Sequence, residues 1–322
     1  MKSVVCFGEA LIDFLNIGQQ QAPPLMLNEF RQYPGGAPAN VAVAVAKLGG
    51  EALFAGQVGQ DAFGDFLQQS LNQYQVNTQY LLRHPSAKTA LAFVMLDEIG
   101  DRSFSFYRDD SADMLFEPAQ VESAWFDTAA CLHFCSNTLT SALSTQTTQK
   151  ALSMASDRGL LISFDVNLRH NLWPDNCVDI ARINHFVAQA DMVKFSADEL
   201  AFLAQGQTDE YIKQQLSQGV TAIVVTDGAN DIHYYSGNIS GMIKAPKVTA
   251  IDTTAAGDAF TGALLFGLSQ FEQPQQVLLD AEKFAKIVEF ASFCGAHAVT
   301  KQGAFPALPQ FEDVSQYWLY NG

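Results

Sequence analysis

Short apolar runs alternate with amphipathic stretches along most of this chain. The runs that predict β-strands are residues 4–7, 52–55, 130–134, 160–164, 192–195 and 222–226. Between them lie stretches whose apolar spacing predicts helices, at residues 61–73, 145–158, 178–190 and 196–204. Strands that alternate with helices predict an α/β fold, with a mostly parallel central sheet flanked by helices on both faces.

Two segments depart from this alternation, because residues 11–17 and 89–107 both have the pattern of extended chain. Residues 97–101 (Asp-Glu-Ile-Gly-Asp) predict a turn that joins two strands. In the second of these strands, Phe104 and Phe106 are expected on one face, since successive side chains alternate. A hairpin with aromatic side chains on one face is expected to cover another part of the molecule.

Residues 35–42 (GGAPANVA) begin a run of small residues that ends at Gly49 and Gly50. The alternating Val and Ala residues in this run are compatible with a strand. Pro38 near its start and the glycine pair at its end favour a helix instead.

The stretch most informative about chemistry is residues 252–262 (DTTAAGDAFTG). Ala255, Ala256 and Gly257 have almost no side chain, so at a helix start their backbone N–H groups can approach an anion closely. Asp258 follows directly, and an acid beside an anion site suits a general base in phosphoryl transfer. The spacing alone is equally compatible with a capping role for Asp258.

Together these two segments resemble the two signatures of the ribokinase-like (PfkB) family of sugar and nucleoside kinases. In the first, Asn40 is followed at the family spacing by Gly49 and Gly59, and in the second the DTxxAGD core is intact. The resemblance extends over nearly the whole chain, from GEALID at residues 8–13 to GAFPALP at residues 303–309. Within the family, GGAPANVA and the segments SFDVNLR and VKFSADEL look most similar to bacterial fructokinases.

The resemblance implies a ribokinase-like fold with a small β-sheet lid. The nucleotide-binding α/β domain would comprise residues 1–10, 35–88 and 111–322, and residues 11–34 and 89–110 would form the lid over the sugar. The implied activity is ATP-dependent phosphorylation of a sugar hydroxyl, with D-fructose converted to fructose 6-phosphate. Ribose, 2-keto-3-deoxygluconate or an aminoimidazole riboside remain alternative acceptors, and a non-catalytic sugar-binding regulator is a more distant alternative.

Two other mechanisms are disfavoured by missing motifs. The chain has no G-x-x-x-x-G-K-[ST], so it is not a P-loop kinase. It also lacks G-x-G-x-x-G, which argues against a dinucleotide-dependent hydride-transfer enzyme.

By resemblance, Asp258 takes the proton from the attacking sugar hydroxyl, and the backbone of residues 255–257 forms the anion hole. Many family members have Gly at position 255, and Ala is expected to be tolerated there if its φ is negative. Short polar groups suit the recognition of a vicinal diol. The residues expected to bind the sugar are Asp13, Gly35, Gly36, Asn40, Phe104, Phe106, Arg108, Arg169 and Asp258 itself.

The nucleotide and ion sites are likewise implied by the resemblance. Glu199 matches the last position of the family's N-x-x-E, which organises metal-bound water, so Mg²⁺ is expected with ATP. Ser196 stands where Asn is usual, and Ser196 with Glu199 would also form a helix capping box. K⁺ is an expected activator, held near Asp252, Thr254 and Gly303. The residues expected to bind the nucleotide are Lys194, Ser196, Thr226, Gly228, Ala256, Gly257 and Ser292.

Composition and charge restrict the possible partners. A formal net charge of −16 argues against a general binder of nucleic acid or anionic membranes. Residues 1–8 are strand-like, and no run of about 18 apolar residues is present, so we expect a cytoplasmic protein. The extended, aromatic-rich segments of the lid favour a homodimer that forms through it.

Overall fold

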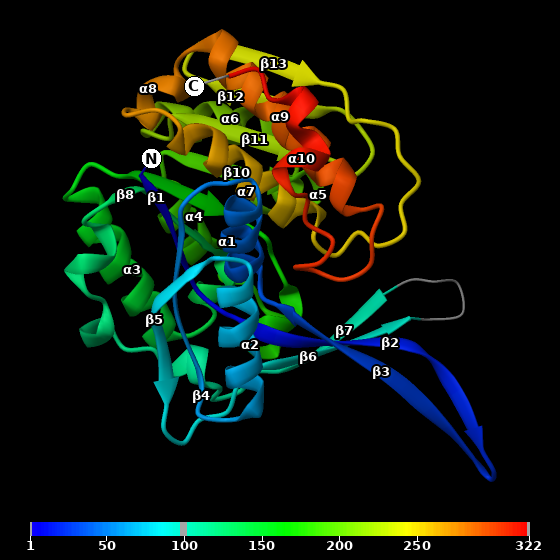
Figure 1. The fold of residues 1–322 in the computed structure, drawn as a ribbon. Helices are drawn as coiled ribbons and strands as arrows, with labels where there is room; N and C mark the ends of the chain where they lie inside the picture. Colours follow the sequence, from blue (N-terminus) through cyan, green and yellow to red (C-terminus); the bar gives the residue numbers. More distant parts are fainter. Residues whose placement is uncertain (1, 97–101, 321–322) are drawn as a thin grey trace.

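The computed structural model describes residues 2–96 and 102–320. Among these residues, nine strands form one central sheet with the order β13-β12-β11-β10-β9-β8-β1-β4-β5 (Figure 1). The strands are β1 (Ser3–Phe7), β4 (Ala52–Gly59), β5 (Asn77–His84), β8 (Ala129–Cys135), β9 (Leu161–Asp165), β10 (Met192–Ser196), β11 (Ala222–Thr226), β12 (Ile232–Ser236) and β13 (Ile239–Ile243).

The central sheet is parallel from β5 to β11, and β12 and β13 continue it with antiparallel pairing. All six predicted strand segments lie in this sheet, which confirms the predicted fold class. The carboxyl ends of parallel strands meet at one edge of the sheet, where open α/β sheets bind ligands.

A second sheet has the order β3-β2-β6-β7, from β2 (Leu11–Ala22), β3 (Leu25–Gly35), β6 (Leu91–Leu96) and β7 (Arg102–Tyr107). The β2–β3 hairpin projects far from the rest of the molecule (Figure 1). β6 and β7 pair antiparallel, as predicted, whereas the turn predicted at residues 97–101 lies outside the described residues. The division of the chain into two domains stays a prediction.

Helices cover both faces of the central sheet (Figure 1). The GGAPANVA segment becomes helical at Ala37, as favoured above, with Gly36 as the N-cap residue and Pro38 in the first turn. The helices are α1 (Ala37–Lys47), α2 (Ala62–Gln73), α3 (Ala142–Ser156), α4 (Ile180–Val187), α5 (Ala197–Leu203), α6 (Thr208–Ser217), α7 (Ala256–Ser269), α8 (Pro274–Leu278), α9 (Ala281–Ala298) and α10 (Phe311–Val314). None of these described helices is both long and apolar enough to cross a bilayer.

The two faces of the sheet carry two separate hydrophobic cores. In β1, Val4 and Cys6 join the core formed with α1, α7 and α9, while Val5 and Phe7 join the core formed with α3, α4 and α6. Successive side chains of a strand point to opposite faces, so one fully buried strand contributes to both cores.

Helices α1 and α7 approach each other closely because their contact is lined by small residues. A Cβ atom at Gly262 would overlap the Cβ of Ala44, so only glycine allows this separation. The two helices begin at the same edge of the site, which brings Asn40 of α1 to Asp258 of α7 although 218 residues separate them.

Candidate active site

A cavity of about 250 Å³ opens between the starts of α1 and α7, the first residues of β2 and the loop after β9. Six of the residues predicted to bind the sugar line it, Asp13, Gly36, Asn40, Phe106, Arg169 and Asp258, as does Thr254, which was predicted to hold the monovalent cation. Asn167, which follows β9 two residues before Arg169, also lines the cavity, as do Glu9 and Asn137, which were not predicted as site residues. Glu9 and Asn137 each lie just beyond the carboxyl end of a central strand, and this position is the signal that could have found them.

Asp258 lies in the first turn of α7, and only 8% of its surface is exposed. Asn40 Nδ2 donates a hydrogen bond of 2.7 Å to Asp258 Oδ2. Burial raises the pKa of Asp258 to about 7, although the Asn40 hydrogen bond opposes this by favouring the charged form. A carboxyl group with a pKa near neutrality is suited to accept a proton from a substrate and release it afterwards.

The helix start beside Asp258 has the geometry that an anion hole needs. Ala255 is the N-cap residue with φ −105°, so the expected negative φ is confirmed and its methyl group causes no backbone strain. A Cβ atom at Gly257 would lie 3.2 Å from Lys194 Nζ, so glycine leaves room for this ammonium group against the helix N-terminus. Lys194 and the start of α7 therefore form one positively polarised surface.

Lys194 is held in place by a buried ion pair. Its Nζ lies 3.0 and 2.9 Å from the two carboxylate oxygens of Asp165, and Thr261 Oγ1 donates to the same carboxylate. Burial lowers the pKa of Lys194, but the charges of Asp165 and Glu199 outweigh this effect and raise it overall. The amine therefore stays protonated at the floor of the site.

The glycine pair at the start of α1 makes room for two acidic residues. A Cβ atom at Gly35 would overlap Asp13 Oδ2, and one at Gly36, where φ is +102°, would overlap the carbonyl oxygen of Glu9. Burial raises the pKa of Asp13 to about 7, and the nearby charge of Asp258 adds to this rise. The two carboxyl groups therefore influence each other across the cavity.

The cavity presents hydrogen-bond acceptors. Among the described residues, Asn40 Oδ1 and Asn137 Oδ1 are buried oxygens with no hydrogen-bond partner. They line the same cavity as the carboxyl groups of Asp13 and Asp258. A ligand with several hydroxyl groups can donate to such a set of oxygens.

Three predicted sugar-binding residues remain. Gly35 is the last residue of β3 and lies against the Asp13 carboxylate. Arg108 is 6% exposed and pairs with Asp113, and it lines a separate cavity of about 10 Å³ rather than the larger one. The side chain of Phe104 lies outside the described part of the chain.

The predicted nucleotide-binding residues are spread along the neighbouring strand ends. Ser196 and Thr226 are paired at the carboxyl ends of β10 and β11, and Gly228 follows with φ +54°. Ser292 lies in α9, where its hydroxyl donates to the carbonyl of Glu289. Their contacts with a nucleotide stay predictions.

Glu199 forms the capping box that the sequence allowed. Its carboxylate oxygens accept from the backbone N–H groups of Leu168 and Ser196, both at 2.8 Å, and Ser196 Oγ accepts from the Glu199 N–H. No group of three His, Cys, Asp or Glu residues in the described chain could hold a metal ion by itself. The role of Glu199 toward a metal ion stays a prediction.

The three residues predicted for a monovalent cation do lie together. One oxygen of Asp252 accepts from the Thr254 N–H at 2.8 Å, and the other accepts from the Gly303 N–H at 3.0 Å. The carboxylate thus ties the loop before α7 to the loop at Gly303, and a hard cation could bind at this oxygen-rich junction.

Comparison with known proteins identifies the family. The model of the pfkB family of carbohydrate kinases matches residues 1–310. The chain belongs to this family. Fructokinase-2 of Zea mays is 40% identical over 312 residues, which make up 95% of this chain and 91% of that protein.

Solved structures agree with this assignment. The Xylella fastidiosa fructokinase with bound ATP has a TM-score of 0.91 and 41% identity, covering 98% of this chain and 97% of that one. The Vibrio cholerae O395 fructokinase, bound to fructose, ADP and calcium ion, has a TM-score of 0.88 and 37% identity, covering 98% and 99%. A double mutant of the Vibrio cholerae enzyme, bound to fructose, ADP and potassium ion, has a TM-score of 0.88 and 36% identity, covering 98% of both chains. The pfkB resemblance seen in the sequence is thus confirmed.

Proposed function

We propose that this pfkB-family kinase is a fructokinase, which transfers the γ-phosphoryl group of ATP to the 6-hydroxyl of D-fructose. The observation that carries the proposal is the buried carboxyl group of Asp258, held by Asn40 at 2.7 Å beside the start of α7. The acceptor-lined cavity next to it suits a polyhydroxy substrate. The fructokinases of Zea mays, Xylella fastidiosa and Vibrio cholerae support the choice of sugar and nucleotide.

In the proposed reaction, the 6-oxygen of fructose forms a bond to the γ-phosphorus while the bond from that phosphorus to the bridging oxygen of ADP breaks. Asp258 accepts the proton of the attacking hydroxyl. The α7 N-terminus at residues 255–257 and the ammonium group of Lys194 stabilise the negative charge that is shared among the phosphoryl oxygens. Arg169 lines the sugar cavity and provides a cation near the two carboxyl groups.

Two ions belong to this proposal. Mg²⁺, bound with the nucleotide, would neutralise phosphate charge, and Glu199 would hold it through water. K⁺ would bind near Asp252, Thr254 and Gly303 and stiffen the loop that leads into the anion hole. The Vibrio cholerae fructokinase structures, one with bound calcium ion and one with bound potassium ion, support the proposal that ions bind here.

The homodimer and the cytoplasmic location are also proposals. The projecting β2–β3 hairpin exposes Ile17, Leu25, Met26 and Leu27, and a second copy of the hairpin could cover these apolar side chains. The acidic net charge and the reduced cysteines are consistent with the cytoplasm.

The first test is ADP release from Mg·ATP in the presence of K⁺, over a panel of fructose, ribose, glucose, 2-keto-3-deoxygluconate and an aminoimidazole riboside. We expect turnover on fructose, and we expect Asp258→Asn to lower kcat by about 10²–10⁴ because the amide cannot accept the proton. A thermal melt of the variant controls for folding. Turnover on another sugar alone would replace fructose as the substrate, and full activity of Asp258→Asn would remove Asp258 as the base.

A further inference from the structure

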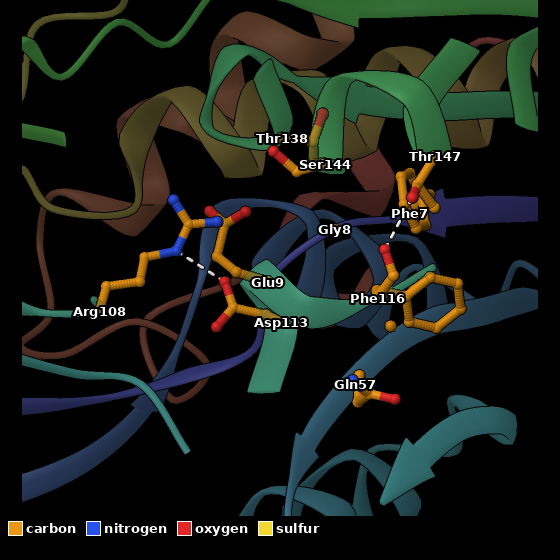
Figure 2. A pocket seen from close by; sticks show the side chains of 11 residues that line it. Phe7, Gly8, Glu9, Gln57, Arg108, Asp113, Phe116, Thr138, Ser144 and Thr147 are labelled. Carbon is orange, nitrogen blue, oxygen red and sulfur yellow. Dashed lines mark hydrogen bonds and ion pairs between the residues drawn. The ribbon is translucent and has the colours of Figure 1, made fainter. Parts of the chain in front are cut away.

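A buried network of charged residues lies behind the sugar cavity, and the reaction proposed above does not use it. Glu9, which follows β1, is 2% exposed, and Arg108, which follows β7, is 6% exposed. Figure 2 shows the Arg108 guanidinium beside the carboxylate of Glu9, with a dashed line to the carboxylate of Asp113. Burying these charges is costly, so the arrangement calls for a specific explanation.

The Glu9 carboxylate determines which end of the Asn137 amide faces the cavity. Glu9 Oε1 accepts from Asn137 Nδ2 at 2.9 Å and from the Ala37 backbone N–H at 3.3 Å. An ionised carboxylate has no proton to donate and can only accept, so the Asn137 amide turns its nitrogen toward Glu9. Asn137 Oδ1 is then left buried and without a partner among the described residues, in a side chain that lines the sugar cavity.

Arg108 holds the same asparagine from its backbone. Its Nη1 donates to the Asn137 carbonyl at 3.0 Å, and its Nε donates to Asp113 at 2.6 Å. The second oxygen of Asp113 accepts from Ser111, which orients the carboxylate. Asn137 is therefore fixed at both its backbone and its side chain, and its backbone anchor directly follows a strand of the small sheet.

We infer that Glu9 is a positioning residue for substrate recognition, which holds the Asn137 amide so that its Oδ1 accepts a hydrogen bond from a sugar hydroxyl. This inference rests on the proposed sugar-kinase function and extends it to a recognition group. Asn40 shows the same arrangement, because its nitrogen is used by Asp258 and its oxygen is left for the ligand. The cavity thus favours a ligand that can donate hydrogen bonds to two amide oxygens, Asn40 Oδ1 and Asn137 Oδ1.

The test uses Glu9→Gln in the full-length protein. The Gln oxygen is attracted to Arg108, so its NH₂ group faces Asn137 and favours the opposite amide orientation. We expect the KM for fructose to rise roughly tenfold, which is the effect of one lost hydrogen bond, with kcat and the KM for ATP nearly unchanged. A network that only stabilises the fold would lower Tm and leave the ratio of the two KM values as it was, and that result would overturn the inference.

Non-additivity provides a second readout. Asn137→Leu removes the amide and should raise the fructose KM by a similar factor, and the double variant should be no worse than either single variant. If the effects of the two substitutions instead multiply, Glu9 does not act through Asn137. If Glu9→Gln does not melt cooperatively, Arg108→Lys takes its place in the comparison of single and double variants with Asn137→Leu. Lysine keeps the positive charge but lacks the guanidinium N–H that reaches the Asn137 carbonyl.

Fructose analogues that each lack one hydroxyl other than that at C6 identify the partner group. With the analogue that lacks the hydroxyl bound by Asn137 Oδ1, wild type and Asn137→Leu should have equal kcat/KM, because neither can form that hydrogen bond. If Asn137→Leu lowers kcat/KM by the same factor for every analogue, Asn137 contacts no sugar hydroxyl and the inference fails.

Asp191→Asn is the matched control. Asp191 is also a shielded carboxylate that accepts a backbone N–H, from Ile162 at 2.7 Å, but it lies at the opposite end of the sheet strands. The Asp191→Asn substitution should leave the fructose KM unchanged. If wild type turns over no sugar, the proposed function fails together with this inference. If wild type turns over fructose and Glu9→Gln, like Asp191→Asn, leaves the fructose KM unchanged, the inference alone fails. If wild type prefers another sugar, the same variants are measured with that sugar instead of fructose.

Discussion

The central sheet and the small sheet obtain their stability in different ways. Strands β1, β8 and β9 are buried along their whole length, because helices cover both faces. In the small sheet, β3 is exposed over its first half and becomes buried only at its last two residues, where it reaches the sugar cavity. The central sheet is thus stabilised by a hydrophobic core on each face, whereas β3 of the small sheet is buried only where it reaches the sugar cavity.

This difference corresponds to a division of roles in the site. Asp258 and Lys194 lie on elements of the well-packed part, so their relative geometry is rigid. Asp13 and Phe106 come from the less buried sheet, which suits a cover that must admit and release a sugar. Substitutions in the two regions should therefore affect different measured quantities.

The largest effect on stability is expected at the contact between α1 and α7. Gly262→Val would place side-chain atoms where Ala44 lies, and overpacking of this kind costs about 1–3 kcal/mol. Chemical denaturation measures the loss. Valine is a better helix former than the glycine it replaces at position 262, so a loss there must come from overpacking. Gln69→Val, on the exposed face of α2, places the same side chain in a helix but against solvent and should cost much less. Equal losses at the two positions would mean that this helix contact is not tightly packed.

A substitution where the two sheets meet should affect sugar binding rather than stability. Gly35→Ala would push away the Asp13 carboxylate, the end of a side chain that can rotate, so the fold should tolerate it. We expect the fructose KM to rise about tenfold through the lost or displaced hydrogen bond, with Tm and the KM for ATP nearly constant. A large fall in Tm with an unchanged fructose KM would contradict this assignment of Asp13.

The pH profile provides a finer test of the rigid part. Asp258 must be ionised to accept a proton, so kcat/KM should fall as the pH decreases through its pKa of about 7. The Asn40 hydrogen bond stabilises the charged form, so Asn40→Leu should raise the pKa of Asp258 and move the acidic limb to higher pH. A limb that stays in place, or moves to lower pH, would show that Asn40 does not tune the base.

The smallest effect on the monomer is expected at the tip of the small sheet. Leu25 is 61% exposed, and Leu25→Ser should change the unfolding free energy of the monomer by less than about 0.5 kcal/mol. If the hairpin forms the proposed homodimer, the same substitution should weaken self-association in sedimentation velocity. Wild-type protein that sediments only as a monomer at micromolar concentration would rule the dimer out.

Much of the fold and the centre of the site could be predicted because their signals are local. Strand runs such as residues 222–226, the helix signals around Pro38, and Asp258 behind three small residues are all readable within a few positions. The strand β3 was harder to predict, because the mixed sequence LMLNEFRQYPG has no clean alternation and its pairing with β2 is what makes it a strand.

The sequence by itself determined the fold class, the pfkB resemblance and the presence of an acid at a helix start, since each depends on neighbouring residues. Only the tertiary structure decided that Asn40 contacts Asp258, that Arg108 faces Asp113 behind the sugar cavity, and that Glu9 directs the amide of Asn137. These outcomes depend on which donors and acceptors meet after burial, and on which oxygen is then left without a partner. Asn40 and Asp258, like Glu9 and Asn137, are more than a hundred positions apart and carry no local sign of their pairing. Arg108 and Asp113 are close in sequence, but that both are buried behind the cavity also depends on the packed molecule.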